Sequence, residues 1–328
     1  MSLSHRRQFL ASAAAAGSAM FLRADTVVAP QRRLEGIFPI MQTPFTDAGA
    51  LDHETLANEV RFLDRIGVQG MVWPQLASEY VSLTYEERLA GAETIVRANH
   101  ALDARTRPAT VIGVQAADTG IAVKYARHAE KLGADAIVAI PLDGGKDESK
   151  QMDYYAAIGA ACSKPLIVQT IGNMSVDLVL RMAKAIPTLR YAKDEAGVTL
   201  ARLTDYRQRA QILQGVFTGA HGPTLLDELA RGACGNMPSS GFADLYVAAW
   251  QAWKNRRQEE AIEIFSKTLL LIMDARAYGI PGQKYILQLR GVFPNTKCRG
   301  EAANALFDDE AKASIERTVN FAKKWFKT

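Results

Sequence analysis

Strand-like apolar runs and amphipathic helical segments alternate eight times between residues 36 and 255, and no other feature limits the fold so strongly. The apolar runs are largely continuous, which is typical of strands buried on both faces of a parallel sheet. Eight strand–helix units over about 220 residues match a closed (β/α)8 barrel in number and size. The expected strands are Gly36–Thr43, Val68–Pro74, Ala109–Val114, Ala136–Pro141, Pro165–Thr170, Leu189–Lys193, Gln211–Val216 and Cys234–Pro238.

Helices are expected between these strands because apolar residues recur there at helical spacing, as at Leu56, Val60 and Leu63. A doubly wound open sheet is the alternative architecture. That fold normally has a glycine-rich phosphate turn after its first strand, and Thr43-Pro44-Phe45-Thr46 is not such a turn, so the barrel is favoured. The expected helices are His53–Ile66, Tyr85–Asn99, Thr119–Leu132, Lys150–Cys162, Val176–Ile186, Thr199–Ala210, Thr224–Ala230 and Ala243–Asn255.

The pattern becomes purely helical after the eighth unit, in Glu259–Ala275, Gly282–Leu289 and Asp308–Phe326. An apolar stripe in the first of these helices needs a surface to cover, either the barrel or a neighbouring subunit. We therefore expect a catalytic barrel at residues 35–256, a C-terminal helical extension at 257–328, and a homo-oligomer. The stripe consists of Ile262, Ile264, Phe265, Leu269 and Leu270.

The N-terminus is expected to be an export signal at residues 1–29. Arg6-Arg7 precedes Phe9-Leu10 and a mildly apolar stretch to Leu22, a pattern similar to a twin-arginine signal. The stretch is too short for a permanent membrane span, and the cleavage window is Ala24 to Ala29. We expect the chain to engage the twin-arginine export machinery and to work in the periplasm. A disordered basic tail is the alternative, with a cytoplasmic location.

Composition excludes several classes of function. The formal charge is only +4 and the basic residues are scattered, so no nucleic-acid partner is expected. Cys162, Cys234 and Cys298 are too widely and irregularly spaced for a disulfide framework or a metal site, and we expect three buried thiols. No cluster of histidines and carboxylates has metal-ligand spacing, so we expect neither a metal nor an organic cofactor.

Lys193 is the strongest candidate for chemistry. It ends the expected strand Leu189–Lys193 and precedes Asp194-Glu195-Ala196-Gly197, which begins a strand-to-helix turn. The active sites of such barrels lie at the C-terminal ends of the strands, where loss of hydration favours a neutral amine that can condense with a ketone. Spacing alone favours a plainer role, a lysine that extends to solvent or pairs with Asp194.

With the barrel in place, the chain resembles the dihydrodipicolinate synthase / N-acetylneuraminate lyase family of class I aldolases, from about Gly36 to the last helix. This resemblance implies that Lys193 forms an imine with a 2-oxo acid. The segments that carry it are Gly36-Ile37-Phe38-Pro39, Thr43-Pro44-Phe45, Ser78-Glu79, Tyr191-Ala192-Lys193-Asp194-Glu195-Ala196-Gly197, Phe217-Thr218-Gly219, Leu229-Ala230-Arg231-Gly232-Ala233-Cys234-Gly235 and Leu289-Arg290-Gly291-Val292.

The chain departs from the family pattern at the substrate-binding loops. After the second strand the family has Gly-Thr-Thr-Gly-Glu, whereas this chain has Gln75-Leu76-Ala77-Ser78-Glu79; a backbone anion site can survive there, with Ser78 donating a hydroxyl. After the fifth strand the family's relay tyrosine is replaced by Gln169, which can orient a substrate but cannot transfer protons. A second tyrosine is missing at Pro141-Leu142-Asp143-Gly144, and a substrate-recognising cation is missing at Asn173-Met174-Ser175.

Three explanations of the missing proton relay remain open. The substrate's own carboxylate can shuttle protons, a substitute residue can act, or catalysis is lost. The candidate substitutes are His221, whose ordinary pKa suits the task, and Tyr191, one layer below Lys193. Plainer roles are a loop residue for His221 and barrel filling for Tyr191. Glu79 is expected to close a structural hydrogen bond, and Asp194 to face the helices.

We expect a Schiff-base lyase, an aldolase or a dehydratase, that acts on pyruvate or a 2-oxo-3-deoxy sugar acid. Lys193 and His221 are the expected catalytic residues. The alternative is an exported barrel that binds 2-oxo acids with impaired catalysis. The expected substrate-binding residues are Ala77, Ser78, Gln169, Gly219 and Ser239.

Overall fold

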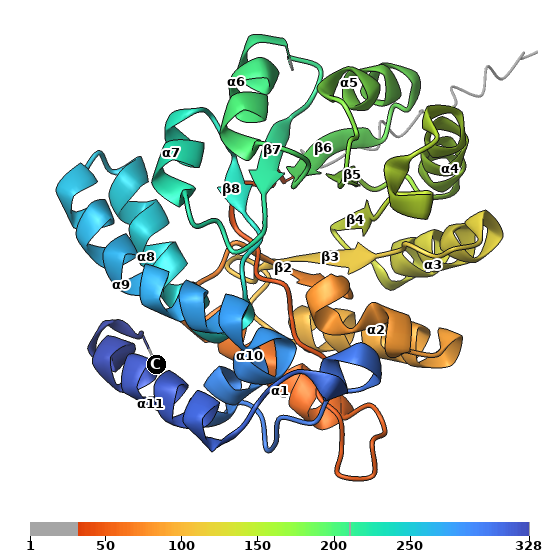
Figure 1. Ribbon diagram of the computed structural model, residues 1–328. Coiled ribbons are helices and arrows are strands. Elements are labelled where there is room, and N and C mark those ends of the chain that lie inside the picture. The colour runs from red at the N-terminus through yellow and green to blue at the C-terminus, as the bar shows by residue number, and fades with distance from the viewer. Residues whose placement is uncertain (1–31, 210, 328) are drawn as a thin grey trace, which may run out of the picture. The chain divides into compact units, whose positions relative to one another are not determined.

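The computed structural model describes residues 32–209 and 211–327. The barrel and the helices that follow it belong to one compact unit, Leu34–Thr328. Figure 1 shows the strands at the centre of this unit and the helices around them. The export signal expected at residues 1–29 lies outside the described residues.

The strands of the described chain form an eight-stranded parallel sheet in the order β1-β8-β7-β6-β5-β4-β3-β2. Ile40 bridges Val72 on one side and Ser239 on the other, which closes the sheet between β1 and β2. The (β/α)8 barrel is therefore confirmed, and the open doubly wound sheet is excluded. The strands are β1 (Gly36–Ile37), β2 (Gly70–Trp73), β3 (Ala109–Gly113), β4 (Ala136–Ala139), β5 (Leu166–Thr170), β6 (Leu189–Asp194), β7 (Gly215–Thr218) and β8 (Gly235–Asn236).

Local capping chemistry explains where several helices begin and end. The Asp52 carboxylate accepts a hydrogen bond from the Thr55 amide at the start of α1, and Gly67 ends this helix at φ 82°, a left-handed conformation that glycine adopts readily. The helices are α1 (His53–Ile66), α2 (Tyr85–His100), α3 (Thr119–Leu132), α4 (Glu148–Ala161), α5 (Val176–Ala185), α6 (Thr199–Arg209), α7 (Leu225–Ala230), α8 (Ala243–Lys254), α9 (Gln258–Ala277), α10 (Gly279–Leu289) and α11 (Asp309–Ala322).

Seven of the eight strands are shorter than expected, and the reason is clearest for β7 and β1. β7 begins at Gly215 because residues 211–214 form a turn, in which Leu213 packs into the layer between barrel and helices instead of extending the strand. Regular pairing of β1 stops at Ile37, before Pro39, which has no amide hydrogen to donate. Apolar character alone cannot distinguish a strand residue from a buried turn residue.

The core has two layers. The larger layer lies between the strands and the helices, and a second cluster fills the barrel itself. This filling supports the strand ends from below, so the pocket above it has a rigid floor. The barrel-filling residues are Leu34, Phe38, Ile40, Val72, Ala109, Val111, Ala136, Val138, Ile167, Tyr191, Phe217, Cys234 and Met237.

The three last helices form the expected C-terminal extension. α9 packs on α8, and α10 and α11 pack on α9 (Figure 1). Within the described chain, no helix is both long enough and apolar enough to span a membrane. Cys162 and Cys234 are buried free thiols, as expected, whereas Cys298 is only partly buried.

Candidate active site

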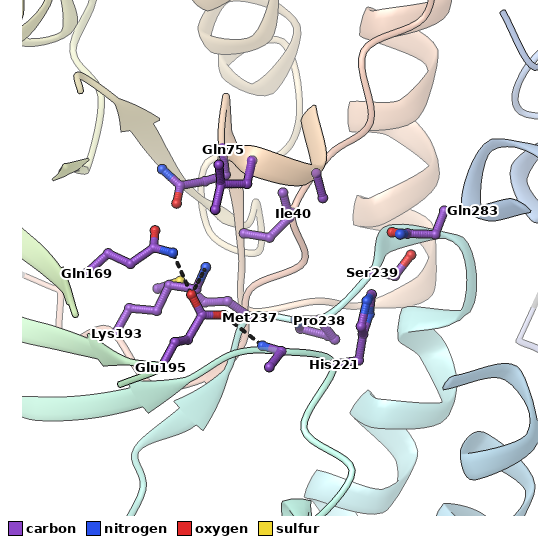
Figure 2. A pocket seen from close by; sticks show the side chains of 13 residues that line it. Ile40, Gln75, Gln169, Lys193, Glu195, His221, Met237, Pro238, Ser239 and Gln283 are labelled. Carbon is purple, nitrogen blue, oxygen red and sulfur yellow. Dashed lines mark hydrogen bonds and ion pairs between the residues drawn. The ribbon is translucent and has the colours of Figure 1, made fainter. Parts of the chain in front are cut away.

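A pocket of about 110 Å³ lies at the C-terminal ends of the barrel strands. Figure 2 shows Gln169, Lys193 and Glu195 on one side of it, and His221, Ser239 and Gln283 on the other. The loops after β1, β2, β7 and β8 complete the wall. The barrel topology thus brings residues as far apart in the sequence as Ile40 and Gln283 together at the end of the barrel where active sites of this fold lie.

The alternation of β6 directs Lys193 into this pocket. Tyr191 below it belongs to the cluster inside the barrel, whereas Ala192 belongs to the layer under the helices. Lys193 is paired in register with Gln169 on β5 and Phe217 on β7, and it is only 4% exposed. Its amine is therefore nearly dehydrated and faces the pocket, as an imine-forming lysine requires.

Glu195 contacts the lysine, a contact that the sequence reasoning missed. Its Oε2 lies 3.1 Å from the Lys193 Nζ and also accepts a hydrogen bond from Gln169 Nε2. Its Oε1 accepts a hydrogen bond from the Ala220 amide at 2.7 Å. A signal was present, since residues two apart along an extended segment share a face, so Glu195 follows Lys193 toward the pocket.

Gly219 leaves the space that this carboxylate occupies. A β-carbon at residue 219 would lie 1.9 Å from Glu195 Oε1 and 2.8 Å from Lys193 Cε. Such distances are far below van der Waals contact, so only glycine fits there without displacing the pair. The structure places Gly219 against the Lys193–Glu195 pair, whereas we expected it to bind substrate.

Asp194 points away from the pocket and anchors the turn that carries Glu195. Its carboxylate accepts bidentate hydrogen bonds from Arg202 on α6 and one from the Thr170 hydroxyl. That hydroxyl in turn accepts a hydrogen bond from the Glu195 amide. Asp194 therefore faces the helices, as alternation predicts, and this network fixes the backbone just beyond Lys193.

The loop after β2 supplies backbone amides. Leu76 and Ala77 line the pocket at the start of a short 3-10 helix, Leu76–Ser78, where the first amides have no partner within the helix. The Ser78 hydroxyl instead donates to the Met41 carbonyl and accepts from the Gln75 amide, and Ser78 does not line the pocket. The expectation that Ser78 donates a hydroxyl to the substrate is therefore corrected, because that proton is already used.

The two expected substitutes for the relay lie in unsuitable surroundings. His221 lines the pocket, but burial, reinforced by the positive charge of Arg276, lowers its pKa from 6.5 to about 4. Its imidazole is therefore neutral near pH 7 and is a poor proton donor at that pH. The hydroxyl of Tyr191, inside the barrel, accepts a hydrogen bond from the Leu34 amide, away from the pocket. Tyr191 is barrel filling.

Several buried polar atoms of the pocket wall lack a hydrogen-bond partner among the described residues. They are Gln75 Oε1, Gln169 Oε1, His221 Nδ1 and Ser239 Oγ, and all four side chains line the pocket. A buried polar atom without a partner is costly, so these atoms suit a ligand with several hydroxyl groups. Within the described residues, no group of three histidine, cysteine or carboxylate side chains is placed to hold a metal ion.

The chain matches the model of the dihydrodipicolinate synthetase family over residues 33–321. It belongs to this family. It is 27% identical over 277 residues to the L-2-keto-3-deoxyarabonate dehydratase of Azospirillum brasilense, covering 81% of this chain and 88% of that protein. It is also 27% identical over 296 residues to a probable 2-dehydro-3-deoxy-D-pentonate aldolase of Escherichia coli, covering 87% and 96%.

Solved structures agree on the fold. YagE, a prophage protein of the dihydrodipicolinic acid synthase family from E. coli K12 solved in complex with pyruvate, superimposes with a TM-score of 0.80. The alignment covers 89% of this chain and 99% of YagE at 22% sequence identity. The protein is thus a lyase of the dihydrodipicolinate synthetase family with the family's barrel.

The side chains that line the pocket differ from the family pattern at the substrate-binding loops. None of the lining residues is a tyrosine or an arginine, and Lys193 and Glu195 are its only charged groups. The segment Asn173-Met174-Ser175, where the family has a substrate-recognising cation, has structural contacts here. Ser175 caps α5, and the Met174 carbonyl accepts a hydrogen bond from Arg202. The Arg202 guanidinium on α6 is paired with Asp194, and Arg202 is not among the residues that line the pocket.

Proposed function

We propose that this lyase forms a Schiff base between Lys193 and the keto carbon of a 2-oxo-3-deoxy sugar acid. The observation that carries the proposal is the buried amine of Lys193, which faces a pocket at the C-terminal ends of the strands. Lys193 attacks the keto carbon, and loss of water gives a protonated imine. This cationic imine accepts electrons from C3, so the C3–C4 bond or a C3–H bond can break. Hydrolysis then releases the product and the free lysine.

The pocket wall supports a hydroxylated substrate. Gln169, Ser239 and His221 offer neutral hydrogen-bonding atoms, which suit the hydroxyl groups of a sugar acid. Leu76 and Ala77 line the pocket at the start of a 3-10 helix, and we infer that their amides hold the carboxylate next to the keto group. The two sugar-acid lyases similar to this chain, a dehydratase and an aldolase, support the same substrate class and leave both reaction outcomes open.

Borohydride trapping tests the imine. Reduction in the presence of pyruvate or a 2-oxo-3-deoxy pentonate should add the mass of the reduced ligand to the peptide that contains Lys193. The Lys193→Ala variant should show no adduct. A label on a different lysine, or none with any 2-oxo acid, contradicts the proposed chemistry.

The substrate class is tested by comparing kcat/KM for a 2-oxo-3-deoxy sugar acid with that for pyruvate plus aspartate semialdehyde. Neutral groups of the pocket wall such as Gln169 and Ser239 suit the hydroxyl groups of a sugar acid, which aspartate semialdehyde lacks. Among the described residues that line the pocket, Lys193 is the only cation, so no second cation is present there to bind the carboxylate of aspartate semialdehyde. We expect the sugar acid to be preferred by at least about 100-fold. A value near 10⁴ M⁻¹s⁻¹ or above for aspartate semialdehyde would reverse this assignment.

A binding protein with impaired catalysis is the second candidate function. The absence of tyrosine from the pocket favours it, together with the low pKa of His221. Such a protein would form the imine with a 2-oxo acid without turning over any sugar acid. Steady-state assays with a panel of 2-oxo-3-deoxy acids separate the two functions, since turnover above that of Lys193→Ala excludes a mere binder.

We also propose that the chain is exported by the twin-arginine machinery and works in the periplasm. Arg6-Arg7 before Phe9-Leu10 supports this location. Replacement of both arginines by lysine should retain a reporter fusion in the cytoplasm. A fusion that is exported regardless, or that never leaves the cytoplasm with the native sequence, contradicts the proposed route.

Homo-oligomer formation through α9 is the last part of the proposal. This helix buries Phe265 against the protein, yet its opposite face exposes Ile262 (58%), Leu270 (47%) and Met273 (62%). An apolar stripe of this kind suits a second copy of the chain better than water. Light scattering should report an oligomer for the native chain and a smaller species for Ile262→Glu/Met273→Glu; a native monomer contradicts it.

A further inference from the structure

We propose that Glu195 is the catalytic acid–base of imine formation and hydrolysis, and takes the place of the missing tyrosine relay. The inference rests on the proposed function, because it assigns a proton carrier to the Lys193 imine. The family resemblance assigns no role to this residue. Three observations carry it: the position of the carboxylate, the neutral groups that hold it, and the lack of a competing proton carrier in the pocket wall.

The carboxylate lies at the reacting atom. Glu195 Oε2 is 3.1 Å from the Lys193 Nζ, and Figure 2 shows both side chains at the same edge of the pocket. Within the described residues, Glu195 is the only ionic partner of this amine. Proton transfer between the two groups therefore needs no intervening residue.

Neutral donors hold the carboxylate in place. Gln169 Nε2 binds Oε2 and the Ala220 amide binds Oε1, while Gly219 leaves the necessary space. The local charge therefore consists of one ammonium and one carboxylate. A proton that passes from Nζ to Oε2 neutralises both at once, so the buried site never gains a net charge from this step.

The other polar groups of the pocket wall do not serve as well. Gln169, Gln75 and Gln283 are amides, which do not exchange protons in catalysis. The Ser239 hydroxyl has no basic partner among the described residues. His221 lines the pocket, but the ionic contact of the Lys193 amine is with Glu195 and not with the imidazole.

The proton balance of the step closes without another reagent. The ammonium of Lys193 gives a proton to Glu195, and the free amine forms the C–N bond with the keto carbon. The carboxylic acid protonates the resulting alkoxide, and the carboxylate then removes a proton from the new ammonium nitrogen. The acid finally protonates the carbinol hydroxyl, the C–O bond breaks and water leaves. The site ends with a protonated imine and a carboxylate, and hydrolysis reverses the sequence.

Rapid-quench borohydride trapping with pyruvate tests the assignment. Glu195→Gln keeps the side-chain length and an acceptor for the Ala220 amide but cannot carry a proton. We expect its rate of imine formation at Lys193 to fall by about 10²–10⁴-fold. The matched control Glu148→Gln changes a half-exposed glutamate paired with Arg181 outside the barrel, and should react at the native rate.

Chemical rescue separates a proton carrier from a merely structural carboxylate. Glu195→Ala opens space beside the amine, so added formate or acetate should accelerate imine formation in proportion to its concentration, while chloride at equal ionic strength should not. Rescue also establishes that the variant is folded. A folded Glu195→Gln that labels as fast as the native protein, or a Glu195→Ala that no carboxylate rescues, overturns the role of Glu195 and leaves the Lys193 lyase standing. A native protein that forms no adduct overturns both.

Discussion

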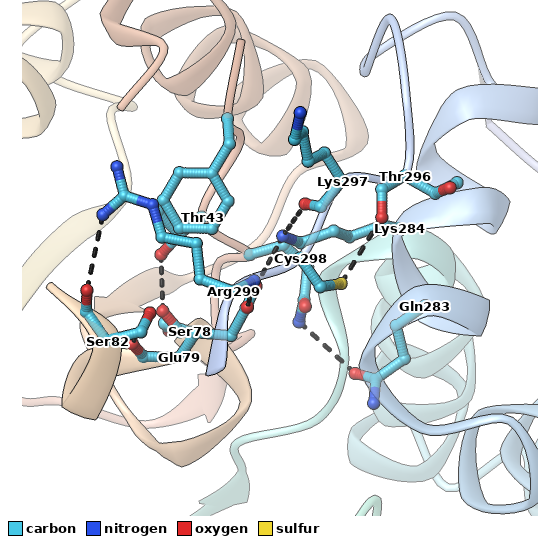
Figure 3. A network of polar contacts seen from close by, with 12 residues as sticks. Thr43, Ser78, Glu79, Ser82, Gln283, Lys284, Thr296, Lys297, Cys298 and Arg299 are labelled. Atoms are coloured by element: carbon cyan, nitrogen blue, oxygen red, sulfur yellow. Dashed lines mark hydrogen bonds and ion pairs between the residues drawn. The ribbon is translucent and has the colours of Figure 1, made fainter. Parts of the chain in front are cut away.

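Two lysine–glutamate pairs lie near the mouth of the barrel, and they differ in access and in number of partners. Lys193 and Glu195 have side chains 5% and 16% exposed and face the pocket, whereas Lys284 and Glu79 are 0% and 2% exposed. Figure 3 shows the second pair inside a network. Lys284 also donates to the Lys297 carbonyl at 2.6 Å, and Glu79 accepts from the Arg299 amide at 2.6 Å.

This contrast distinguishes an ion pair that stabilises the fold from one whose lysine can react with a substrate. The Lys284–Glu79 pair joins the loop after β2 to the segment after α10, and its extra hydrogen bonds satisfy charges that water cannot reach. Glu79 therefore has the structural role expected from the sequence. Among the described residues, the Lys193 amine has Glu195 as its ionic partner, and it also faces the pocket. A substrate bound there can therefore reach the amine nitrogen. Burial alone does not mark a catalytic lysine.

The largest effect is expected for Lys193→Met. Loss of the nucleophile should lower turnover of the best 2-oxo-3-deoxy acid by roughly 10⁴–10⁶-fold. The free energy of unfolding should fall less than in Lys284→Met, since Glu195 keeps its two neutral donors and faces the pocket. Steady-state assays and urea titration measure the two quantities. Substantial residual turnover would mean that another group is the nucleophile.

The opposite result is expected for Lys284→Met. Removal of one member of a sealed pair leaves the Glu79 charge buried, which costs about 3–5 kcal/mol of folding free energy. Urea titration measures this loss, and the double variant Glu79→Gln/Lys284→Met should recover part of it. The folded fraction should still form the imine. If Lys284→Met were as stable as the native chain, the distinction between the two pairs would fail.

A third buried glutamate, Glu59, has no lysine partner in the described part of the chain, and the stability that it contributes should depend on pH. Glu59 forms no ion pair within the described residues, and burial raises its pKa to about 8 although the Gln42 amide donates a hydrogen bond to its Oε1. The folded state then holds this proton more tightly than the unfolded state, so its stabilising contribution is full below about pH 4.5 and is lost as pH rises toward 8.

Glu59→Gln should remove this pH dependence. Between pH 5 and 8 the native chain should lose about 3–4 kcal/mol of folding free energy through Glu59, and the variant should not. Urea titrations at several pH values measure the difference between the two proteins. Parallel stability profiles would show that Glu59 is ionised like a surface carboxylate.

The smallest effect is expected for Gly219→Ala. The added methyl group must push Glu195 or Lys193 aside, and misplacement by about 1 Å costs roughly 10–100-fold in rate. The rate of borohydride-trapped imine formation should fall by that factor. Gly222→Ala, in the same loop, strains a position at φ +52° and meets Asn236 instead of the pair, so it reports the effect of damage to the loop itself. Equal losses in both variants would point to general loop damage.

The fold was largely predictable because its signals are local. Continuous apolar runs, helical periodicity and caps such as Asp52 and Gly67 depend on neighbours in the chain. Local signals failed at Leu213, which is apolar and buried but lies in a turn. Lys193 and the orientation of Asp194 could be inferred from strand alternation, since a period of two needs no tertiary information.

The rest of the site depends on contacts between distant segments. Gln169 binds a carboxylate 26 residues away, and Gly219 is needed because of Glu195 rather than because of its own loop. The lowered pKa of His221 also follows from burial and from Arg276 on α9, neither of which its residue type reveals. No local pattern contains these distances.

The sequence by itself therefore determined the barrel, the strand that carries Lys193 and the face toward which that lysine points, since periodicity and strand order suffice for each. The tertiary structure decided which groups surround the amine. It brought Glu195, Gln169 and the Ala220 amide together and committed the Ser78 hydroxyl to the Met41 carbonyl. Electrostatic interactions depend on distance and dehydration in three dimensions, and these exist only once the eight strands have closed.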